Sequence, residues 1–388
     1  MIYLDHNATS PMRDHAKLAV FAALAETGNA SSVHAAGRAA RARVEAAREA
    51  VAKLAGAKPS SVIFTSCGSE ANALALRGAV AGALAAEDRI TRLFVSATEH
   101  ESVRANTAAL AESVPGLKLS EIPVTKDGVV DLAALRLQLM HGKGRVLVSV
   151  MAANNETGVL QDLGAVARLV RTEGGEDSLL HVDAVQAAGR VALGFDALGA
   201  DYMSLSAHKI GGPQGAGALL VKDGAPLAPL VAGGGQEMGR RSGTENVVAI
   251  AGFGAAAEEV VAFADVARIQ NLRDRFEAEL KRIAPDAVIF GRDAGRLPNT
   301  SNFAVAGLSA ETALIGLDLD GIAVSSGAAC SSGKVKPSHV LTAMGIDEVL
   351  VRSGLRVSFG WTNSEADVDA ALQALARLLA RTRNAKAA

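Results

Sequence analysis

Six short apolar segments separated by longer helical patterns are the feature that most limits how this chain can fold. The segments are 62–66 (VIFTS), 92–97 (RLFVSA), 145–152 (RVLVSVMA), 178–184 (SLLHVDA), 201–207 (DYMSLSA) and 217–221 (GALLV). Between most of them lie alanine- and leucine-rich stretches with helical spacing, such as 38–56 and 163–175. Strands that are apolar along most of their length are typical of parallel sheets covered on both faces. The sequence therefore predicts an α/β fold, with a mostly parallel sheet between helices.

The pattern changes after about residue 245. Two long helical patterns, at about 246–264 and 266–284, precede the short apolar segments AVIF, NFAV and LRVSFG and a last helical pattern from about 364. This order indicates a smaller α+β unit, and 388 residues are more than one compact domain usually holds. We expect a large domain over 15–250 and a small domain formed by 1–14 together with 251–388.

Composition narrows the function classes. The chain has 39 Lys and Arg against 41 Asp and Glu, a net charge of -2, which argues against nucleic acid as the main partner. Its two cysteines cannot form a disulfide framework or a four-cysteine metal site, and we expect no metal. No apolar run approaches the roughly 20 residues of a membrane helix, and the start of the chain lacks the features of a secretory signal. We therefore expect a soluble cytoplasmic protein.

Polar residues gather where five of the predicted strands end. They are Cys67, Gly68 and Ser69; Glu99 and His100; Asn154, Asn155 and Glu156; Asp183 and Gln186; and Ser206, His208 and Lys209. In an open parallel sheet, ligands bind outside the carboxyl ends of the strands. We therefore expect these groups to form one site at one edge of the sheet.

Two of these residues have an ordinary and a chemical interpretation. Lys209, in SAHKIGGP, is either a solvated surface lysine or the positioned amine of a Schiff base. Asp183 either caps the next helix or holds the protonated ring nitrogen of a pyridine cofactor, and the residues alone give the two alternatives equal weight.

Two glycine-containing segments are candidates for anion binding. Ser69 follows Gly68 at the start of a helical pattern, where it is either a simple N-cap or a phosphate ligand together with backbone N–H groups. The segment 233–246 (GGGQEMGRRSGTEN) contains Arg240 and Arg241 and is either a surface loop or an anion-binding loop.

A histidine and an arginine complete the pattern. His100 is either an ordinary polar residue or an imidazole that stacks on a flat ring and transfers protons. Arg356, in LRVSFG, is either an exposed arginine or a bidentate ligand of a substrate carboxylate. A lysine, an aspartate, a phosphate site and a stacking histidine together indicate pyridoxal 5'-phosphate as the cofactor.

The chain resembles the cysteine desulfurases of the NifS/IscS type, which belong to the class V aminotransferase-like, fold-type I pyridoxal-phosphate enzymes. Nine segments carry the resemblance in the family's order and spacing: IYLDHNAT, FTSCGSEAN, ATEH, NNETGVLQD, HVDAVQ, SAHKIGGPQG, GGGQEMGRRSGTEN, SSGAACSSG and LRVSFG. The resemblance implies a large domain with a mostly parallel seven-stranded sheet, a smaller α+β domain and a homodimer.

The resemblance also implies roles for individual residues. Lys209 would form the Schiff base with the cofactor, Asp183 would bind its ring nitrogen, and His100 would stack on the ring. The remaining contacts would be made by Gln186 and Asn155 to the ring oxygen or substrate, by Gly68, Ser69, Ser206 and His208 to the phosphate, by Thr244 of the partner subunit to the phosphate, and by Arg356 with Asn155 to the substrate carboxylate. Two positions depart from the family, because Ser69 stands where threonine is common and Cys67 where glycine is common.

Cys330 lies in the segment 325–334 (SSGAACSSGK), among small and polar residues. A structural cysteine usually lies in an apolar element, whereas this composition is typical of a loop. The resemblance implies that Cys330 is the nucleophile, which takes sulfur from L-cysteine as a persulfide and leaves L-alanine. The length of the segment favours the group of the family with a long cysteine loop, which delivers sulfur to an acceptor protein for iron–sulfur clusters or other sulfur-containing cofactors.

Two other function classes remain as alternatives. One is a selenocysteine lyase, or another pyridoxal-phosphate lyase or aminotransferase of the same fold, and such enzymes do not need Cys330 in that loop. The other is a nucleotide-binding or regulatory module with a degenerate site, for which a colourless purified protein would be the sign.

Overall fold

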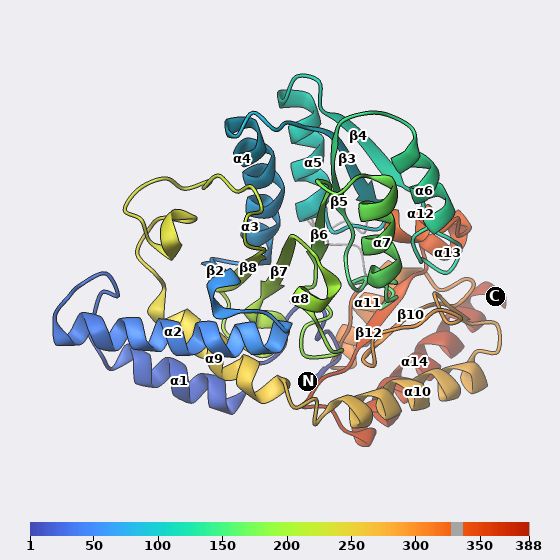
Figure 1. The fold of residues 1–388 in the computed structure, drawn as a ribbon. Coiled ribbons are helices and arrows are strands. Elements are labelled where there is room, and N and C mark those ends of the chain that lie inside the picture. The colour runs from blue at the N-terminus through green and yellow to red at the C-terminus, as the bar shows by residue number, and fades with distance from the viewer. Residues whose placement is uncertain (327–336, 388) are drawn as a thin grey trace.

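A seven-stranded sheet forms the centre of the larger part of the molecule (Figure 1). The computed structural model describes residues 1–326 and 337–387. The strand order is β2-β8-β7-β6-β5-β3-β4, and β8 is antiparallel to both of its neighbours while the other pairs are parallel. The strands are β2 (Val62–Thr65), β3 (Ile90–Ser96), β4 (Lys118–Ile122), β5 (Arg145–Ser149), β6 (Leu179–Asp183), β7 (Tyr202–Ser206) and β8 (Gly217–Val221). The predicted α/β fold with a mostly parallel sheet is confirmed.

Six of the seven strands coincide with the predicted apolar segments, and β4 is the strand that the sequence analysis missed. Its residues, KLSEI, lie at the edge of the sheet and are mostly exposed. An edge strand has only one neighbour and faces solvent, so its sequence needs no apolar run. The seventh strand therefore has no hydropathy signal of its own.

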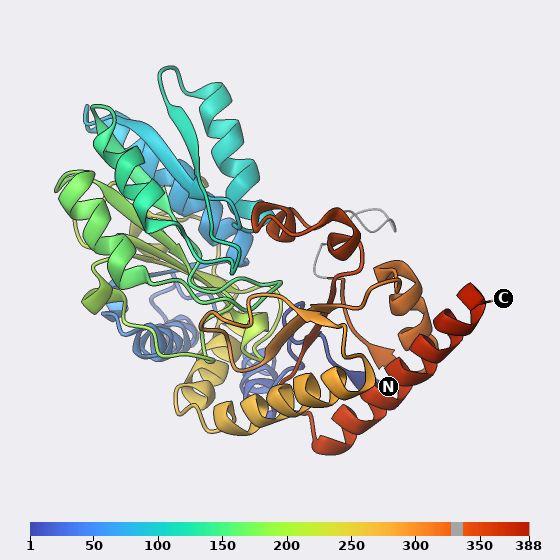
Figure 2. The same cartoon turned by 90° about the vertical axis from the view of Figure 1, so that its right-hand side faces the viewer.

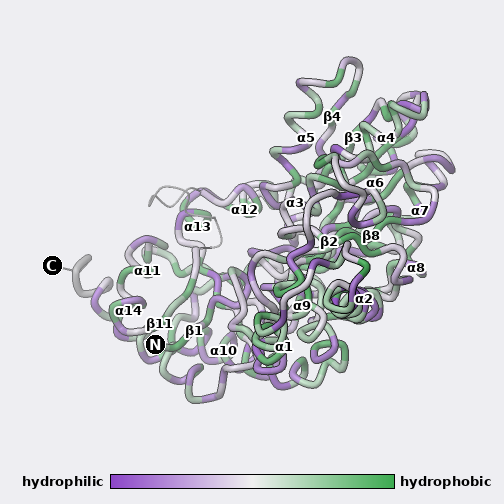
Figure 3. The backbone as a smooth tube through the Cα atoms, turned by 90° about the vertical axis from the view of Figure 1, so that its left-hand side faces the viewer, coloured by the Kyte–Doolittle hydropathy of each residue, from purple (hydrophilic) through white to green (hydrophobic). Residues whose placement is uncertain are grey.

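Helices cover both faces of this sheet. They are α1 (Asp14–Leu24), α2 (Ala35–Ala55), α3 (Gly68–Ala73), α4 (Ala79–Ala85), α5 (Glu101–Ser113), α6 (Leu132–Met140), α7 (Leu163–Glu173), α8 (Phe195–Leu198) and α9 (Val247–Val260). The helix α9 packs against both α1 and α2, and Figure 3 colours β8 and α9 as hydrophobic over most of their length. The helix α2 ends at Gly56, whose φ of 64° lies in the left-handed region that glycine adopts without strain.

The rest of the chain forms a second, smaller layer of strands and helices (Figure 2). A three-stranded antiparallel sheet has the order β12-β10-β9, and β1 pairs in parallel with β11. These elements are β1 (Ile2–Tyr3), α10 (Val266–Ile283), β9 (Val288–Ile289), β10 (Thr300–Ala304), α11 (Ala310–Leu319), β11 (Ile322–Ala323), α12 (His339–Ala343), α13 (Glu348–Val351), β12 (Leu355–Ser358) and α14 (Glu365–Ala387). One hydrophobic cluster joins Leu4 to residues of α10, α11, β12 and α14, so the start of the chain packs with its C-terminal part.

Two expectations from the sequence, the absence of a membrane helix and the domain boundary at residue 250, can be compared with the helices of the structure. Within residues 1–326 and 337–387, none of the helices has both the length and the apolar character that spanning a bilayer requires. The helix α9 runs through residue 250, so the expected boundary between the domains falls inside a helix.

Candidate active site

Most of the polar residues at the strand ends line one cavity of about 340 Å³, whereas Glu99, Asn154 and Glu156 are not part of its wall. Besides Cys67, ten residues singled out from the sequence contribute to its wall: Gly68, Ser69, His100, Asn155, Asp183, Gln186, Ser206, His208, Lys209 and Arg356. Nine of them follow or end β2, β3, β5, β6 and β7, and Arg356 comes from β12 in the smaller layer. The carboxyl edge of the sheet and the smaller layer therefore meet at this cavity.

Lys209 lies in a short 3-10 helix, Ala207–Lys209, directly after β7. Its Nζ donates to the carbonyl oxygens of Asn7 at 2.6 Å and Ala8 at 2.8 Å. Burial and the positive charges of Arg356 and Arg190 lower the pKa of Lys209 to about 7. Near neutral pH, a large share of the amine is therefore uncharged and able to attack a carbonyl carbon.

Asp183 is the last residue of β6, and its side chain is buried. One carboxylate oxygen, Oδ1, accepts the backbone N–H of Val185 at 3.0 Å, and the other, Oδ2, accepts Nδ2 of Asn72 at 2.7 Å. Each oxygen keeps a second acceptor position, because a carboxylate oxygen accepts about two hydrogen bonds. The carboxylate is therefore held in place and still able to accept a proton-bearing nitrogen.

The segment after β2 forms a narrow polar end of the cavity. A Cβ on Gly68 would lie 2.9 Å from Cγ2 of Val185 and 3.2 Å from Cβ of Ser206, so a larger residue there would force these side chains to shift. The Oγ of Ser206 is buried and has no hydrogen-bond partner among the described residues. A buried hydroxyl without a partner is costly, and a ligand that accepts its hydrogen bond would satisfy it.

Cys67 lines the same end of the cavity and is partly exposed. Its Sγ accepts the backbone N–H of Glu70 at 3.4 Å, so it caps α3. A thiol is a weak acceptor, and small polar oxygens are the usual residues at this position. Cys67, which stands where glycine is common in the family that the sequence resembles, thus places a second thiol of this chain in the wall of the cavity.

The two histidines of the wall differ in their surroundings. Burial and the charge of Lys209 lower the pKa of His208 to about 4, so this ring is neutral near pH 7. Its Nδ1 lies 3.1 Å from Oγ1 of Thr9. His100 is exposed and is the N-cap of α5, where its Nδ1 accepts the backbone N–H of Ser102 at 3.1 Å.

Gln186 uses both ends of its side-chain amide within the protein. Its Nε2 donates to the carbonyl oxygen of Asn7 at 2.9 Å, and its Oε1 accepts a hydrogen bond from Arg190. A ligand that binds Gln186 must therefore share or replace one of these contacts.

Arg356 reaches the cavity from β12 and is buried. Its two terminal nitrogens donate to the carbonyl oxygen of Asn155 at 2.9 Å and to Oδ1 of Asp5 at 2.6 Å. Its Nε is buried and has no partner in the described part of the chain. The guanidinium is thus held by protein groups at one end, while Nε remains unsatisfied.

The site also contains residues that the sequence analysis did not single out. Among them are Asn7, Asn72, Ser102 and Met151 in the cavity wall, together with Asp5, the ion-pair partner of Arg356. Asp5 and Asn7 belong to the IYLDHNAT segment and Asn72 to the FTSCGSEAN segment, so the segments marked the region without showing which side chain matters.

Thr244 and the arginines of the glycine-rich segment lie elsewhere. Thr244 is exposed and is not part of the cavity wall of its own chain. Arg241 forms an ion pair with Glu70 of α3, with Nε and Oε1 2.9 Å apart. Within this chain the guanidinium of Arg241 is therefore already paired with a carboxylate, and the interpretation of the segment as an anion-binding loop stays a prediction.

The glycine-rich segment is tied to the large sheet through Glu237. Its carboxylate accepts both terminal nitrogens of Arg48, at 2.8 and 2.9 Å, and the backbone N–H of Phe64 at 2.8 Å. Both Glu237 and Met238 have positive φ, 48° and 59°, which is unusual for residues with a side chain. A buried bidentate pair that fixes the segment explains how this backbone conformation persists.

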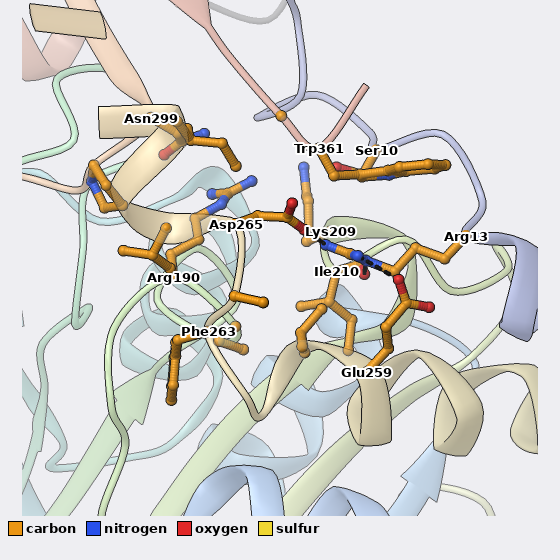
Figure 4. Close-up of a pocket in the computed structure, with 18 of the residues that line it drawn as sticks. Ser10, Arg13, Arg190, Lys209, Ile210, Glu259, Phe263, Asp265, Asn299 and Trp361 are labelled. Atoms are coloured by element: carbon orange, nitrogen blue, oxygen red, sulfur yellow. Dashed lines mark hydrogen bonds and ion pairs between the residues drawn. The ribbon is translucent and has the colours of Figure 1, made fainter. Parts of the chain in front are cut away.

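Lys209 also borders a second, much smaller cavity of about 50 Å³ (Figure 4). Arg13 crosses this region and forms ion pairs with Glu259 at 2.6 Å and Asp265 at 3.1 Å. The guanidinium carbon of Arg13 lies 5.4 Å from the centre of the Trp361 ring, a cation–π distance. These contacts join α9, the start of α10 and the segment after β12 directly beside Lys209.

Cys330 lies outside the described residues. On the N-terminal side of the segment that contains Cys330, Ser325 lines the cavity and forms a β-bridge with Arg356. On the C-terminal side, Oγ of Ser338 donates to the buried carboxylate of Glu156 at 2.5 Å. The described residues on both sides of the segment that contains Cys330 are therefore anchored near the cavity, on β12 and on the turn after β5.

The fold and the cavity define a class of protein, and the comparison with family models agrees with it. Residues 2–371 match the aminotransferase class-V family, and the chain belongs to this family. An IscS-like cysteine desulfurase of Mycobacterium tuberculosis is 41% identical over 388 residues, which cover 99% of this chain and 98% of the relative. A cysteine desulfurase of Cereibacter sphaeroides is 40% identical and covers 96% of this chain, with 94% of the relative matched.

Solved structures of similar proteins share the whole fold. A NifS-like protein of Rickettsia africae has a TM-score of 0.86 and 35% identity over 98% of this chain and 99% of that chain. A second NifS-like protein has a TM-score of 0.88 and 34% identity, again over 98% of this chain and 99% of its own. The resemblance found in the sequence to the NifS/IscS type is therefore confirmed at the level of the family and of the fold.

Proposed function

We propose that this protein is a cysteine desulfurase that converts L-cysteine to L-alanine and transfers the sulfur to Cys330 as a persulfide. The observation that supports it most directly is the cavity that places Lys209, Asp183, His100 and Arg356 together. The net reaction is balanced, because L-cysteine and a thiol give L-alanine and a persulfide with no external oxidant or reductant. The relatives named as cysteine desulfurases, about 40% identical over nearly the whole chain, support the same activity.

The residues present fit pyridoxal 5'-phosphate. The unpartnered hydroxyl of Ser206, the space left by Gly68 and the hydroxyl of Ser69 suit a phosphate at the narrow end of the cavity. The free acceptor positions of Asp183 suit a protonated ring nitrogen, and the depressed pKa of Lys209 suits covalent attachment. When bound, this cofactor supplies an electron sink that makes the bonds at the substrate's α-carbon labile.

The side chains of the cavity would then transfer protons, bind the substrate and contact the cofactor. Lys209 would take up and return protons at Nζ, which its pKa near 7 allows. Arg356, with its unsatisfied Nε, would bind the substrate carboxylate beside Asn155. Gln186 and His208 would complete the cofactor contacts, and His100 would lie against the ring.

We also propose a homodimer in which Thr244 of the partner subunit completes the phosphate site. Thr244 is exposed and lies outside the cavity of its own chain. The helix α1 exposes Leu18, Phe21 and Leu24, each more than 60% accessible, a row of apolar side chains that a second copy would cover. A sedimentation measurement tests this: the wild type should be a dimer, and Phe21→Glu should yield monomers with weaker cofactor binding. A wild-type monomer with full cofactor affinity would contradict the proposal.

The division into domains, the sulfur acceptor and the location of the protein belong to the same proposal. The division into a large domain of residues 15–250 and a small domain of 1–14 with 251–388 agrees with the packing of Leu4 against the C-terminal part. The sulfur on Cys330 would pass to an acceptor protein, and a cytoplasmic location would provide the reducing conditions that keep both thiols free.

The activity is tested with the purified protein, pyridoxal phosphate and L-cysteine. The wild type should form alanine and, with a reductant present, sulfide in equal amounts. Cys330→Ala should keep the absorbance of the bound cofactor and lose sulfide formation. Sulfide release by Cys330→Ala at the wild-type rate would refute the mechanism, and consumption of selenocysteine but not cysteine would favour a selenocysteine lyase.

A further inference from the structure

His100 and Asp183 are joined by a continuous chain of hydrogen bonds through two residues that have no role in the proposed function. Nδ1 of His100 lies 2.8 Å from Oγ of Ser102, which lies 2.9 Å from Nδ2 of Asn72. The same Nδ2 lies 2.7 Å from Oδ2 of Asp183. All four residues line the cavity, and they come from α3, α5 and the end of β6.

The positions of the protons in this series of hydrogen bonds follow from which groups can donate and which can only accept. An ionised carboxylate only accepts hydrogen bonds, so Asn72 must present its NH₂ group to Asp183. The same NH₂ group donates its other hydrogen to Oγ of Ser102. The hydroxyl of Ser102 then has its own hydrogen left to donate to Nδ1 of His100.

The backbone of Ser102 makes a second contact with His100, and this contact does not depend on the hydroxyl of Ser102. The backbone N–H of Ser102 points at the same Nδ1, at 3.1 Å, as the N-cap contact of α5. A backbone N–H can only donate, so Nδ1 must carry a lone pair and not a proton. The proton of the neutral ring of His100 is therefore on Nε2, the nitrogen left for a molecule in the cavity.

We propose that Asn72 and Ser102 are positioning residues that hold His100 as an Nε2–H hydrogen-bond donor toward the bound substrate. In this tautomer, Nε2 of the neutral ring cannot accept a proton, because it already carries one. Removal of the substrate's α-proton then falls to Lys209, whose Nζ lies in the same wall. The inference rests on the proposed function for the identity of the substrate, and the tautomer itself does not depend on sulfur transfer.

Nitrogen-15 NMR of the holoenzyme labelled at histidine tests the tautomer, with His100 assigned through His100→Gln. The wild type and Ser102→Thr, which keeps the hydroxyl, should show Nε2–H. In Ser102→Ala the ratio of Nε2–H to Nδ1–H should fall about two- to tenfold, the change that one hydrogen bond supports. Ser113→Ala, the same substitution in the last turn of α5, is the matched control and should show the wild-type ratio.

The link to Asp183 is tested by a double-mutant cycle of Ser102→Ala and Asn72→Ala. Asn72→Ala should raise the dissociation constant of pyridoxal phosphate about tenfold, because Asp183 loses a charge-assisted hydrogen bond. The effect of Ser102→Ala on the tautomer ratio should be smaller in the Asn72→Ala background than in the wild type. If Asn72→Ala folds poorly, the comparison of Ser102→Ala with Ser102→Thr still tests the tautomer.

Three results would overturn the inference: Nδ1–H in the wild type, equal ratios in Ser102→Ala and Ser102→Thr, or additive effects in the cycle. Each of these readouts is independent of turnover. A wild type that binds the cofactor but forms no alanine would instead refute the proposed function, so the two failures are distinguishable.

Discussion

The two walls of the cavity are built in different ways. The wall that would hold the cofactor consists of residues at the ends of neighbouring parallel strands, such as Asp183 at the end of β6 and Lys209 after β7. The opposite wall depends on Arg356 of β12 and its ion pair with Asp5, which is 351 residues away in the chain. The first wall follows from the topology of one sheet, whereas the second exists only when the ends of the chain come together.

The segment around Asn7 joins the two walls. Its carbonyl oxygen accepts hydrogen bonds from Lys209 and Gln186, and its amide nitrogen donates to Oγ1 of Thr300 in β10. Asp5, two residues earlier, forms the ion pair with Arg356. The N-terminal segment therefore positions the amine and the guanidinium at the same time, and changes in one wall can be separated from changes in the other by the variants below.

The largest effect is expected for Lys209→Ala in the cofactor wall. Turnover should fall by about 10³-fold or more, since the variant would lose the amine that we propose both attaches the cofactor and transfers protons. Alanine formation from L-cysteine measures it, with circular dichroism to verify folding. Turnover within tenfold of the wild type would show that Lys209 is not the essential amine.

Arg356→Gln probes the opposite wall. The KM for L-cysteine should rise about 10- to 100-fold, the cost of losing charged hydrogen bonds to a carboxylate, while the affinity for pyridoxal phosphate changes little. Arg352→Gln is the matched control, because Arg352 lies on the exposed surface four residues earlier. If Arg356→Gln weakened cofactor binding as much as substrate binding, the division into two walls would be wrong.

The next prediction concerns pH and the apoprotein. The pKa of Lys209 is lowered to about 7 by burial and by Arg356 and Arg190, so the reactive neutral amine is lost as the pH falls below that value. Covalent capture of pyridoxal phosphate should therefore slow about tenfold for each pH unit well below 7 and level off above it. Stopped-flow absorbance measures the rate.

Asp5→Asn sharpens the same experiment. The Asp5 carboxylate raises the pKa of Lys209, so its removal should move the midpoint of the rate profile to lower pH. A midpoint near the ordinary lysine value of about 10.4 would contradict the described environment of the amine. An unchanged midpoint in Asp5→Asn would show that the two walls are electrostatically independent.

The sequence predicted the cofactor wall far better than the opposite wall, and the reason is physical. Parallel strands bring their carboxyl ends to one edge, so Ser206 and Asp183 could be placed together from the strand pattern alone. The pairing of Asp5 with Arg356 depends on tertiary packing between distant segments, which leaves no periodic signal. The same holds for Asn72, whose contact with Asp183 crosses from α3 to β6.

The strands of the fold were also predictable from the sequence only where local hydropathy marks them. Six strands were predicted because they are buried and apolar, whereas the edge strand β4 was not, because solvent covers part of it. The two very short strands β1 and β11 also have no pattern of their own. Burial thus decides which elements a sequence reveals, and the resemblance to a family supplied the rest.

The smallest effect is expected for Cys67→Ala, which tests whether the thiol of the cofactor wall takes part in the reaction. Its Sγ accepts the N–H of Glu70 as the cap of α3 and the exposed hydroxyl of Ser66, and the loss of such a cap costs about 1 kcal/mol or less. Alanine formation should therefore stay within about threefold of the wild type, and Cys67→Ser, which keeps a capping oxygen, is the control. A loss as complete as that expected for Cys330→Ala would mean that the sulfur is received in the cofactor wall, and the proposed role of Cys330 would have to be abandoned.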